Sequence, residues 1–240
     1  PRVVPTARKL KTVTYDEMLE LAASGAKVLH LRCVEYARRY NLPIHVRSSF
    51  SPNEGTWVVE NHPEGGNMEQ AIISGIAHDK TEAKVTIVGV PDRTGIAARI
   101  FQAIADADIN IDMIVQNVSA AATGLTDISF TVPKAEGANA TAVLKRIQGE
   151  VGFASIQYDD SIGKLSLVGA GMRSHPGVTA TFFAAMAEAG VNIEMISTSE
   201  IRISIICRES DLEKGVRAAH TAFGLDADQV EAVVYGGSGR

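Results

Sequence analysis

Cysteine, positive charge and long apolar runs are all scarce in this chain of 240 residues. No apolar run approaches the roughly 20 residues that a membrane-spanning helix needs, and the first residues, PRVVPTARKL, lack the apolar core of a signal peptide. We therefore expect a cytoplasmic protein that binds no membrane. The two cysteines, Cys33 and Cys207, stand far apart without a CxxC spacing, which argues against a disulfide or zinc framework. We expect both to be reduced, buried thiols.

The charge balance is acidic, with 23 Lys and Arg residues against 28 Asp and Glu residues and a formal net charge of -5. A protein that binds nucleic acid needs a basic surface to contact phosphates, so we expect no nucleic-acid partner. Hydrophobic residues make up 45% of the chain, and its length suffices for two domains of ordinary size.

The first 60 residues indicate two helices followed by a strand. Thr14 and Glu17 have the spacing of a capping box, Gly25 is placed to end the helix that they begin, and residues 43–46 form a short β-rich run. The second helix is predicted to bury Leu29, Cys33, Ala37 and Tyr40. This segment is too small for a core of its own and is typical of the end of an α/β domain. Residues 61–68, rich in glycine and asparagine, are the predicted linker.

The rest of the chain contains an internal repeat. KVTIVGVPDRTGIAARIFQAIADADINIDMIVQ, from Lys84, aligns with KLSLVGAGMRSHPGVTATFFAAMAEAGVNIEMIST, from Lys164, with one small insertion. Each copy carries the same one-sided apolar stripe of a helix, formed by Ile96, Ile100, Phe101 and Ile104 in the first copy and by Val178, Phe182, Phe183 and Met186 in the second.

Each half continues with two β-rich runs, a second helix and a closing strand, ASIQY or EAVVY. Ser210 and Glu213 have the spacing of a capping box for the last helix. The predicted inward positions of the two second helices are Val143, Leu144 and Ile147, and Leu212, Val216, Ala219 and Phe223. The order βαββαβ, found twice, predicts an α+β fold with two tandem ferredoxin-like domains over residues 69–160 and 161–240, each an antiparallel four-stranded sheet with two helices on one face. Residues 70–78 form a further strand that could join the edge of either sheet.

The stretch VGAGMRSHPGV, residues 168–178, follows a strand and opens a helix, as a dinucleotide-binding loop does. Its glycines do not fit, because Arg173 and Ser174 stand where the fingerprint needs a third small residue, and two strands follow in succession. A catalytic Ser-His pair is weaker still, since Ser174 and His175 are sequence neighbours. The simplest interpretation is that Ser174 caps the helix, Pro176 lies in its first turn and His175 is exposed.

The equivalent first loop, GVPDRTG, suits a free amino acid. A helix N-terminus attracts a carboxylate, Gly95 permits exposed backbone amides, and the Asp92 side chain can hold an ammonium group. The alternative is that Asp92 merely caps the helix.

Two such units, with VGVPDRTGIAARIF, INIDMIVQNVS, GAGMRSHPGV and VNIEMISTSEIRIS, resemble the paired ACT domains of the aspartate kinase family. YDEMLELAASGAKVLHLRCVEYARRYNLPIHVRSSFSPNEGT resembles the end of its amino-acid-kinase catalytic domain, which assigns residues 1–60 to that domain. In this family ACT units pair side by side, and effector amino acids lie at the seams.

The resemblance implies effector-binding residues in both units. In the first unit these are Asp92, Thr94, Gly95, Ile96, Ala97, Asn110, Gln116, Asn117, Ser119, Thr126, Asp127 and Ser129. In the second they are His175, Pro176, Gly177, Val178, Thr179, Asn192, Ile193, Glu194, Ser197, Thr198 and Ser199.

The resemblance also implies L-threonine or L-lysine as effectors, and either a homodimer through the ACT domains or a catalytic alpha subunit as partner. It implies feedback inhibition of the reaction of ATP with L-aspartate that gives 4-phospho-L-aspartate. No cofactor or metal is expected in this chain, and ATP and Mg belong to the intact parent kinase. The alternatives are an ACT sensor of another enzyme and a dinucleotide-binding enzyme.

We predict that this chain alone does not phosphorylate aspartate, because the family's Lys-Phe-Gly-Gly-Thr-Ser stretch and most of its catalytic domain are absent from the sequence. The measurement is ATP-dependent formation of aspartyl phosphate by the purified chain. Activity traceable to this polypeptide would contradict the prediction.

Overall fold

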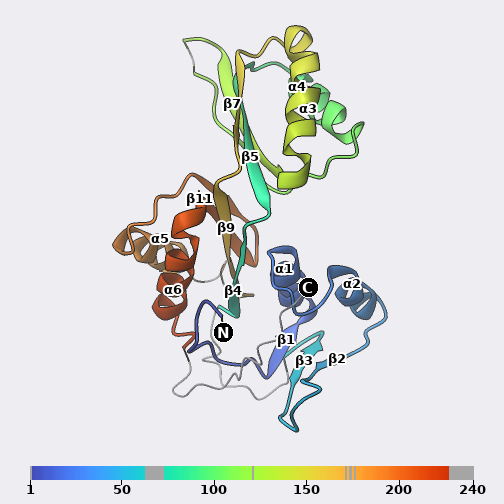
Figure 1. Cartoon of the computed structure of the whole chain (residues 1–240), viewed down its shortest axis with the longest axis vertical. Coiled ribbons are helices and arrows are strands. Elements are labelled where there is room, and N and C mark those ends of the chain that lie inside the picture. The colour runs from blue at the N-terminus through green and yellow to red at the C-terminus, as the bar shows by residue number, and fades with distance from the viewer. Residues whose placement is uncertain are drawn as a thin grey trace. The chain divides into compact units, whose positions relative to one another are not determined.

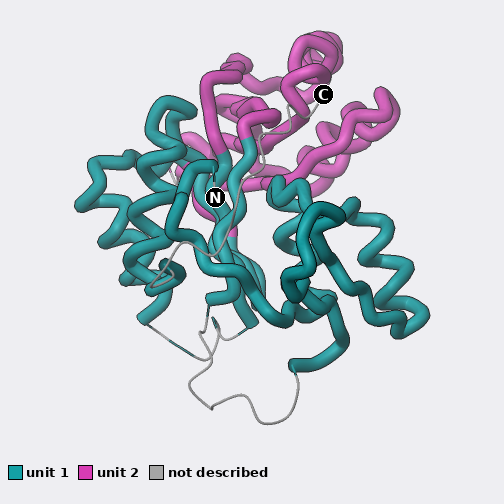
Figure 2. Tube along the Cα trace, turned by 60° about the horizontal axis from the view of Figure 1, so that its bottom comes forward, with its two compact units in different colours: residues 1–79, 164–194, 198–240 teal, residues 80–163, 195–197 magenta. Residues whose placement is uncertain are grey.

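The computed structural model describes residues 2–62, 73–120, 122–170, 172, 175 and 177–226. The chain divides into two compact units (Figure 2). Unit 1 comprises Pro1–Asp79, Lys164–Glu194 and Thr198–Arg240, and unit 2 comprises Lys80–Gly163 and Met195–Ser197. Among the described residues, no helix has the length and apolar content needed to cross a bilayer.

Unit 2 has the predicted βαββαβ order. Its elements are β5 (Glu82–Pro91), α3 (Ile96–Ala105), β6 (Ile114–Gln116), β7 (Leu125–Pro133), the 3-10 turn Lys134–Glu136, α4 (Gly137–Val151) and β8 (Ser155–Asp159). The strand order is β6-β7-β5-β8, every pair is antiparallel, and α3 and α4 cover one face of the sheet (Figure 1).

The core of unit 2 lies between that face and the two helices. The predicted stripe of α3 is confirmed, since Ile100 and Ile104 are fully buried and Ile96 and Phe101 pack against the same core. The inward positions of α4, Val143, Leu144 and Ile147, are confirmed as well. Residues of β5 and β7 on the same face, among them Val85 and Phe130, complete the core.

Most of the second ACT-like sheet lies in unit 1, while Ile162, Gly163 and Met195–Ser197 belong to unit 2. Its elements are β9 (Ile162–Val168), α5 (Gly177–Glu188), β10 (Met195–Thr198), β11 (Arg202–Arg208), the 3-10 turn Glu209–Asp211 and α6 (Leu212–Ala222). The strand order is β10-β11-β9-β4, where β4 (Gly75–Asp79) pairs antiparallel with β9. The strand that the sequence assigned to neither half thus takes the position beside β9 that β8 takes beside β5. The predicted closing strand EAVVY lies outside the described residues.

The stripe of α5 is confirmed, with Val178, Phe182 and Met186 buried and Phe183 packed against them. On α6, Leu212, Val216 and Ala219 are buried and Phe223 packs partly buried against the same core. This confirms the α+β fold with two ferredoxin-like domains.

The segment before β4 folds as β1 (Thr12–Thr14), α1 (Tyr15–Ala23), α2 (Leu31–Arg39), β2 (Ile44–Val46) and β3 (Thr56–Val59). The capping box is confirmed, because the Glu17 N–H donates to Thr14 Oγ1 at 3.3 Å and Thr14 N–H donates to Glu17 Oε2 at 2.9 Å. Gly25 follows the helix with a φ of 103°. Strands β1 and β3 were not predicted; they pair in parallel and make a three-stranded sheet with β2.

Three sequence predictions were wrong. Cys33 and Tyr40 are exposed, because α2 buries Val34 and Ala37 instead, and Cys33 stands about 100° away from Val34 around the helix. Ser210 does not cap α6, since the chain passes through a 3-10 turn before the helix starts at Leu212. The prediction for Cys207 is confirmed, and burial, followed by the charges of Asp211 and Glu194, raises the pKa of its thiol to about 11.

Helix α1 packs on the face of the second sheet opposite α5 and α6 (Figure 1). Its buried residues Met18 and Leu21 share one apolar cluster with Ala77 of β4 and Val168 of β9. The chain after the helix lies directly on β4, because a β-carbon at Gly25 would stand 2.4 Å from the carbonyl oxygen of His78.

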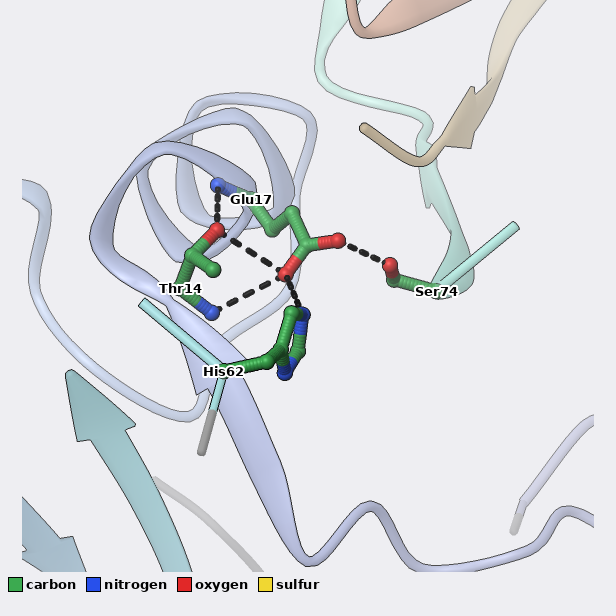
Figure 3. A network of polar contacts seen from close by, with 4 residues as sticks. All are labelled: Thr14, Glu17, His62 and Ser74. Carbon is green, nitrogen blue, oxygen red and sulfur yellow. Dashed lines mark hydrogen bonds and ion pairs between the residues drawn. The ribbon is translucent and has the colours of Figure 1, made fainter. Parts of the chain in front are cut away.

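The side chain of Glu17 joins three parts of unit 1 (Figure 3). Its Oε2 accepts from the backbone and hydroxyl of Thr14 and lies 3.4 Å from His62 Nε2, while its Oε1 accepts from the hydroxyl of Ser74, next to β4. Glu17 is only 2% exposed. Burial by itself would raise the pKa of this carboxyl, but the hydrogen bonds from Ser74 and Thr14 and the nearby His62 outweigh burial and lower it.

We predict that Glu17→Gln lowers the free energy of unfolding of unit 1 by about 1–3 kcal/mol at neutral pH, because buried donors lose a charged acceptor. Since the folded pKa is lowered, the charged form stabilises the fold above the ordinary glutamate pKa, and this stabilisation is lost as the pH falls through the folded pKa. The difference between wild type and variant, measured by denaturant unfolding between pH 7 and about pH 3, should therefore shrink in acid.

Asp16→Asn is the matched control on the same turn. The ion pair of Asp16 with Arg38 is exposed on both sides, so its loss should cost under about 1 kcal/mol. A Glu17→Gln effect that is no larger than the control, or that does not change with pH, would contradict the assignment.

Candidate functional site

The turn from β5 to α3 begins with a bulge in β5. Its register against β7 shifts between Ile87 and Val90, and Gly89 adopts a φ of 69° that favours glycine. The Gly89 N–H donates to Asp127 Oδ1 at 2.9 Å. The predicted site residue Asp127 thus stabilises the bulge that precedes the loop between β5 and α3.

Helix α3 starts without a side-chain cap. Its N-cap is Gly95, in the left-handed region with a φ of 93°, and no side chain bonds to the first turn. The Asp92 side chain is therefore not the N-cap, and its backbone N–H donates to the carbonyl of Gly124 at 2.9 Å. The first amides of a helix have no partner within it, and they carry the positive end of the helix dipole.

Space is open around this helix start. A β-carbon at Gly95 would meet no atom within 4 Å, so the residue is glycine because of its φ rather than because of crowding. Asp92, Thr94 and Gly95 are exposed, and Ile96 and Ala97 are half-buried. The Ile96 N–H donates to the Arg93 carbonyl at 3.2 Å, so the loop presents a carboxylate and the next amides of the first turn, those of Ala97 and Ala98, to the outside of unit 2.

The end of β6 lies beside this loop. The Asn117 N–H donates to the carbonyl of Asp127 at 3.3 Å, and the buried Thr126 hydroxyl donates to the Asn117 carbonyl at 2.6 Å. Thr126 and Asp127 in turn continue β7 next to Val90. The structure therefore brings Gln116, Asn117 and the half-buried Ser119 to the loop end of the sheet.

Two predicted residues do not lie there. Because β5 and β6 both run antiparallel to β7, they point the same way, and Asn110 comes before β6 at the far end from the loop. Helix α3 separates the two ends by about 15 Å. Ser129 lies in the middle of the sheet, where its hydroxyl is 2.8 Å from that of Thr86.

The second loop has the same arrangement in unit 1. The Gly169 N–H donates to the Ile201 carbonyl at 3.0 Å, and the Ser199 N–H donates to the Arg202 carbonyl at 2.8 Å, so exposed Thr198 and Ser199 lie near the loop's base. His175, Gly177 and Thr179 are exposed, and Val178 is buried in the core. Arg173, Ser174 and Pro176 lie outside the described residues.

The remaining predicted residues of the second ACT domain lie elsewhere. Asn192, Ile193 and Glu194 follow the C-terminus of α5, at the opposite end from the loop. Ile193 packs against the core, and Glu194 Oε1 forms an ion pair with Arg208 Nε at 2.9 Å. Ser197, on β10, is half-buried.

The two ACT domains differ at one position that the sequence predictions missed. The hydroxyls of Ser166 and Ser204 are 2.8 Å apart in the second ACT domain, as are those of Thr86 and Ser129 in the first, so Ser204 and Ser129 occupy equivalent positions. Two residues before these serines, the first domain has Asp127 and the second has Arg202. The alignment of TDISF with IRISI contained this difference. Gly89, inside a strand pattern, was also a visible signal for the bulge. Among the described residues, no group of three His, Cys, Asp or Glu side chains is placed to hold a metal.

Comparison with known proteins identifies the families of both parts of the chain. The ACT domain family matches residues 85–147 and 165–223, and the amino acid kinase family matches residues 1–48. Aspartokinase of Mycolicibacterium smegmatis is 60% identical over 240 residues, which is 100% of this chain and 56% of that protein. The chain therefore spans about half the length of the curated relatives it matches.

Two solved structures match the regulatory part. The alpha and beta subunits of an aspartokinase give 47% identity and a TM-score of 0.59, with 63% of this chain and 99% of that chain covered. The ligand-free regulatory subunit of aspartate kinase from Thermus thermophilus gives 40% identity and a TM-score of 0.60 with the same coverage. The chain therefore belongs to the aspartokinase family and carries its regulatory region, two ACT domains, after a fragment of an amino acid kinase domain.

Proposed function

We propose that this chain senses L-lysine or L-threonine and relays that signal to the kinase of the intact enzyme. In the intact enzyme ATP and Mg would serve the conversion of L-aspartate to 4-phospho-L-aspartate, and effector binding would slow it. The observation that supports this most is the uncapped N-terminus of α3, exposed beside Asp92. Such a pathway would operate in the cytoplasm, where we place the protein.

The loop matches the two charged groups that all free amino acids share. Helix amides and dipole favour the carboxylate, and the Asp92 carboxylate favours the ammonium group. A small polar ligand must have almost all its polar groups satisfied to offset desolvation, and Gln116, Asn117 and Ser119 offer further partners on the neighbouring strand end. We assign the distinction between lysine and threonine to these side chains.

The edge of the sheet in unit 2 supports an assembly at this site. Strand β6 is an edge strand; Ile114, its first residue, is 51% exposed, and Val118, two residues after the strand ends, is 96% exposed. An exposed apolar edge strand favours pairing with another strand. We propose that this edge meets another ACT unit, either in a homodimer or in an assembly with a catalytic alpha subunit, and that the effector lies at that seam.

The two other functions fit less well. A dinucleotide-binding enzyme needs a parallel sheet, whereas both ACT-like sheets have antiparallel neighbours. A sensor for an unrelated enzyme would have no use for residues 1–48, which match the amino acid kinase family.

We predict that threonine or lysine raises the melting temperature of the wild-type chain in a thermal-shift panel of free amino acids. The underlying stabilisation is about 2.7 kcal/mol at an effector concentration of 100 times the Kd. Asp92→Ala should abolish binding by calorimetry, because the ammonium group loses its counter-charge.

Asp106→Ala is the matched control. It removes an exposed carboxylate from the other end of α3, where Asp106 accepts from Gln102, and should leave binding unchanged. Equal affinities of wild type and Asp92→Ala would remove Asp92 from the site, and a response to NADH with none to amino acids would favour the dinucleotide enzyme.

We further predict reciprocal coupling in the intact enzyme. An effector that disfavours the active kinase by about 1–3 kcal/mol must bind more weakly, by the same factor, when aspartate and ATP are bound. Calorimetric titration of the effector with and without aspartate and an ATP analogue measures this factor. Identical affinities would contradict an allosteric mechanism.

A further inference from the structure

A second ionic contact, besides the Glu17 cluster, connects α1 to the second ACT sheet. Glu20 Oε2, on α1, lies 3.1 Å from Nη1 of Arg202, the first residue of β11. The Arg202 and Glu20 side chains are 16% and 26% exposed, so bulk water screens this pair less than it screens a surface pair.

Arg202 lies at the base of the second loop. Its carbonyl accepts from Ser199 N–H, and the carbonyl of the preceding Ile201 accepts from the N–H of Gly169, where the loop after β9 begins. Ser199 and Gly169 are therefore hydrogen-bonded to Arg202 and to its direct neighbour in the chain.

Glu17 and Glu20 stand three residues apart on α1 and project to two different parts of one sheet. Glu17 holds Ser74, whose N–H donates to the Val168 carbonyl at 2.8 Å, at the entry to β4. Glu20 holds Arg202 on β11. Between these two polar contacts, Met18 and Leu21 pack in the apolar cluster that α1 shares with the sheet, and Gly25 lies close to His78.

We propose that Glu20 and Arg202 form the coupling contact through which the second ACT domain acts on the kinase domain, with Glu17 as the fixed point of the same contact. The proposal rests on the proposed function, because it specifies how effector binding is transmitted. Ser74 and Val168 anchor one end of α1 to the sheet. Movement of the turn 199–202 pulls on Glu20, about one helical turn further along α1, and tilts the helix relative to the rest of the kinase fragment.

The test uses the intact enzyme, with kinase inhibition and effector binding measured separately. Glu20→Gln should keep the calorimetric affinity for lysine or threonine within about threefold while raising the effector concentration for half-inhibition about tenfold or more. Asp16→Asn is the control, since it removes a carboxylate from the same helix, but its partner Arg38 lies on α2 of the same kinase fragment. Its inhibition curve should match that of wild type.

Charge reversal gives the decisive comparison. Glu20→Arg and Arg202→Glu should each lose inhibition, and the two together should restore it. An unchanged inhibition curve for the single variants, or a double variant that remains insensitive, overturns the proposal.

Hydrogen exchange of wild type provides a measurement that does not depend on the folding of any variant. Amides of residues 15–23 should change protection when the effector is added, and an unaltered helix overturns the proposal. Failure of the proposed function is distinguishable, because in that case wild type binds neither amino acid.

Discussion

In each ACT domain a strand passes into a helix through a short turn, of four residues in the first domain and eight in the second, and the backbone of that turn constrains the residues around it. In unit 2 the turn needs a bulge at Gly89, stabilised by Asp127, and a left-handed Gly95 at the helix start. Because Gly95 offers no side chain, no side chain caps α3, and only the Ile96 amide is taken up, by the Arg93 carbonyl. The requirement of a sharp turn and the chemistry of a carboxylate-binding site are thus met by the same residues.

The second domain differs from the first in what covers its sheet. Its sheet receives β4 from the segment before the first domain and is covered by α1 on the face opposite its own helices. The regulatory sheet and the kinase fragment therefore share an apolar contact and two buried or half-buried carboxylates, Glu17 and Glu20. Arg202, in the position of Asp127, changes a residue that supports the turn into one that reaches the kinase fragment.

Much of this could be predicted from the sequence, because periodic apolar stripes and the Thr14–Glu17 capping box depend on local geometry. The α3 and α5 stripes are examples. The pairing of β4 with β9 could not be predicted, since strand pairing across 85 or more residues leaves no local pattern. Cys33 was misplaced because two apolar spacings, 29-33-37 and 34-37, competed within one short helix. For the site, the loop residues were accessible to sequence reasoning, whereas the position of Asn110 at the far end of α3 followed only from the strand directions.

The central claim is that the uncapped start of α3 receives the carboxylate of a free amino acid. Amide resonances of this chain, followed by nitrogen-edited NMR during titration with threonine and with lysine, test it most directly. The account predicts that the amides of Ile96, Ala97 and Ala98 shift saturably with one of these effectors, and that Asp92→Ala removes the shift. Saturable binding that leaves these three amides unmoved would contradict it.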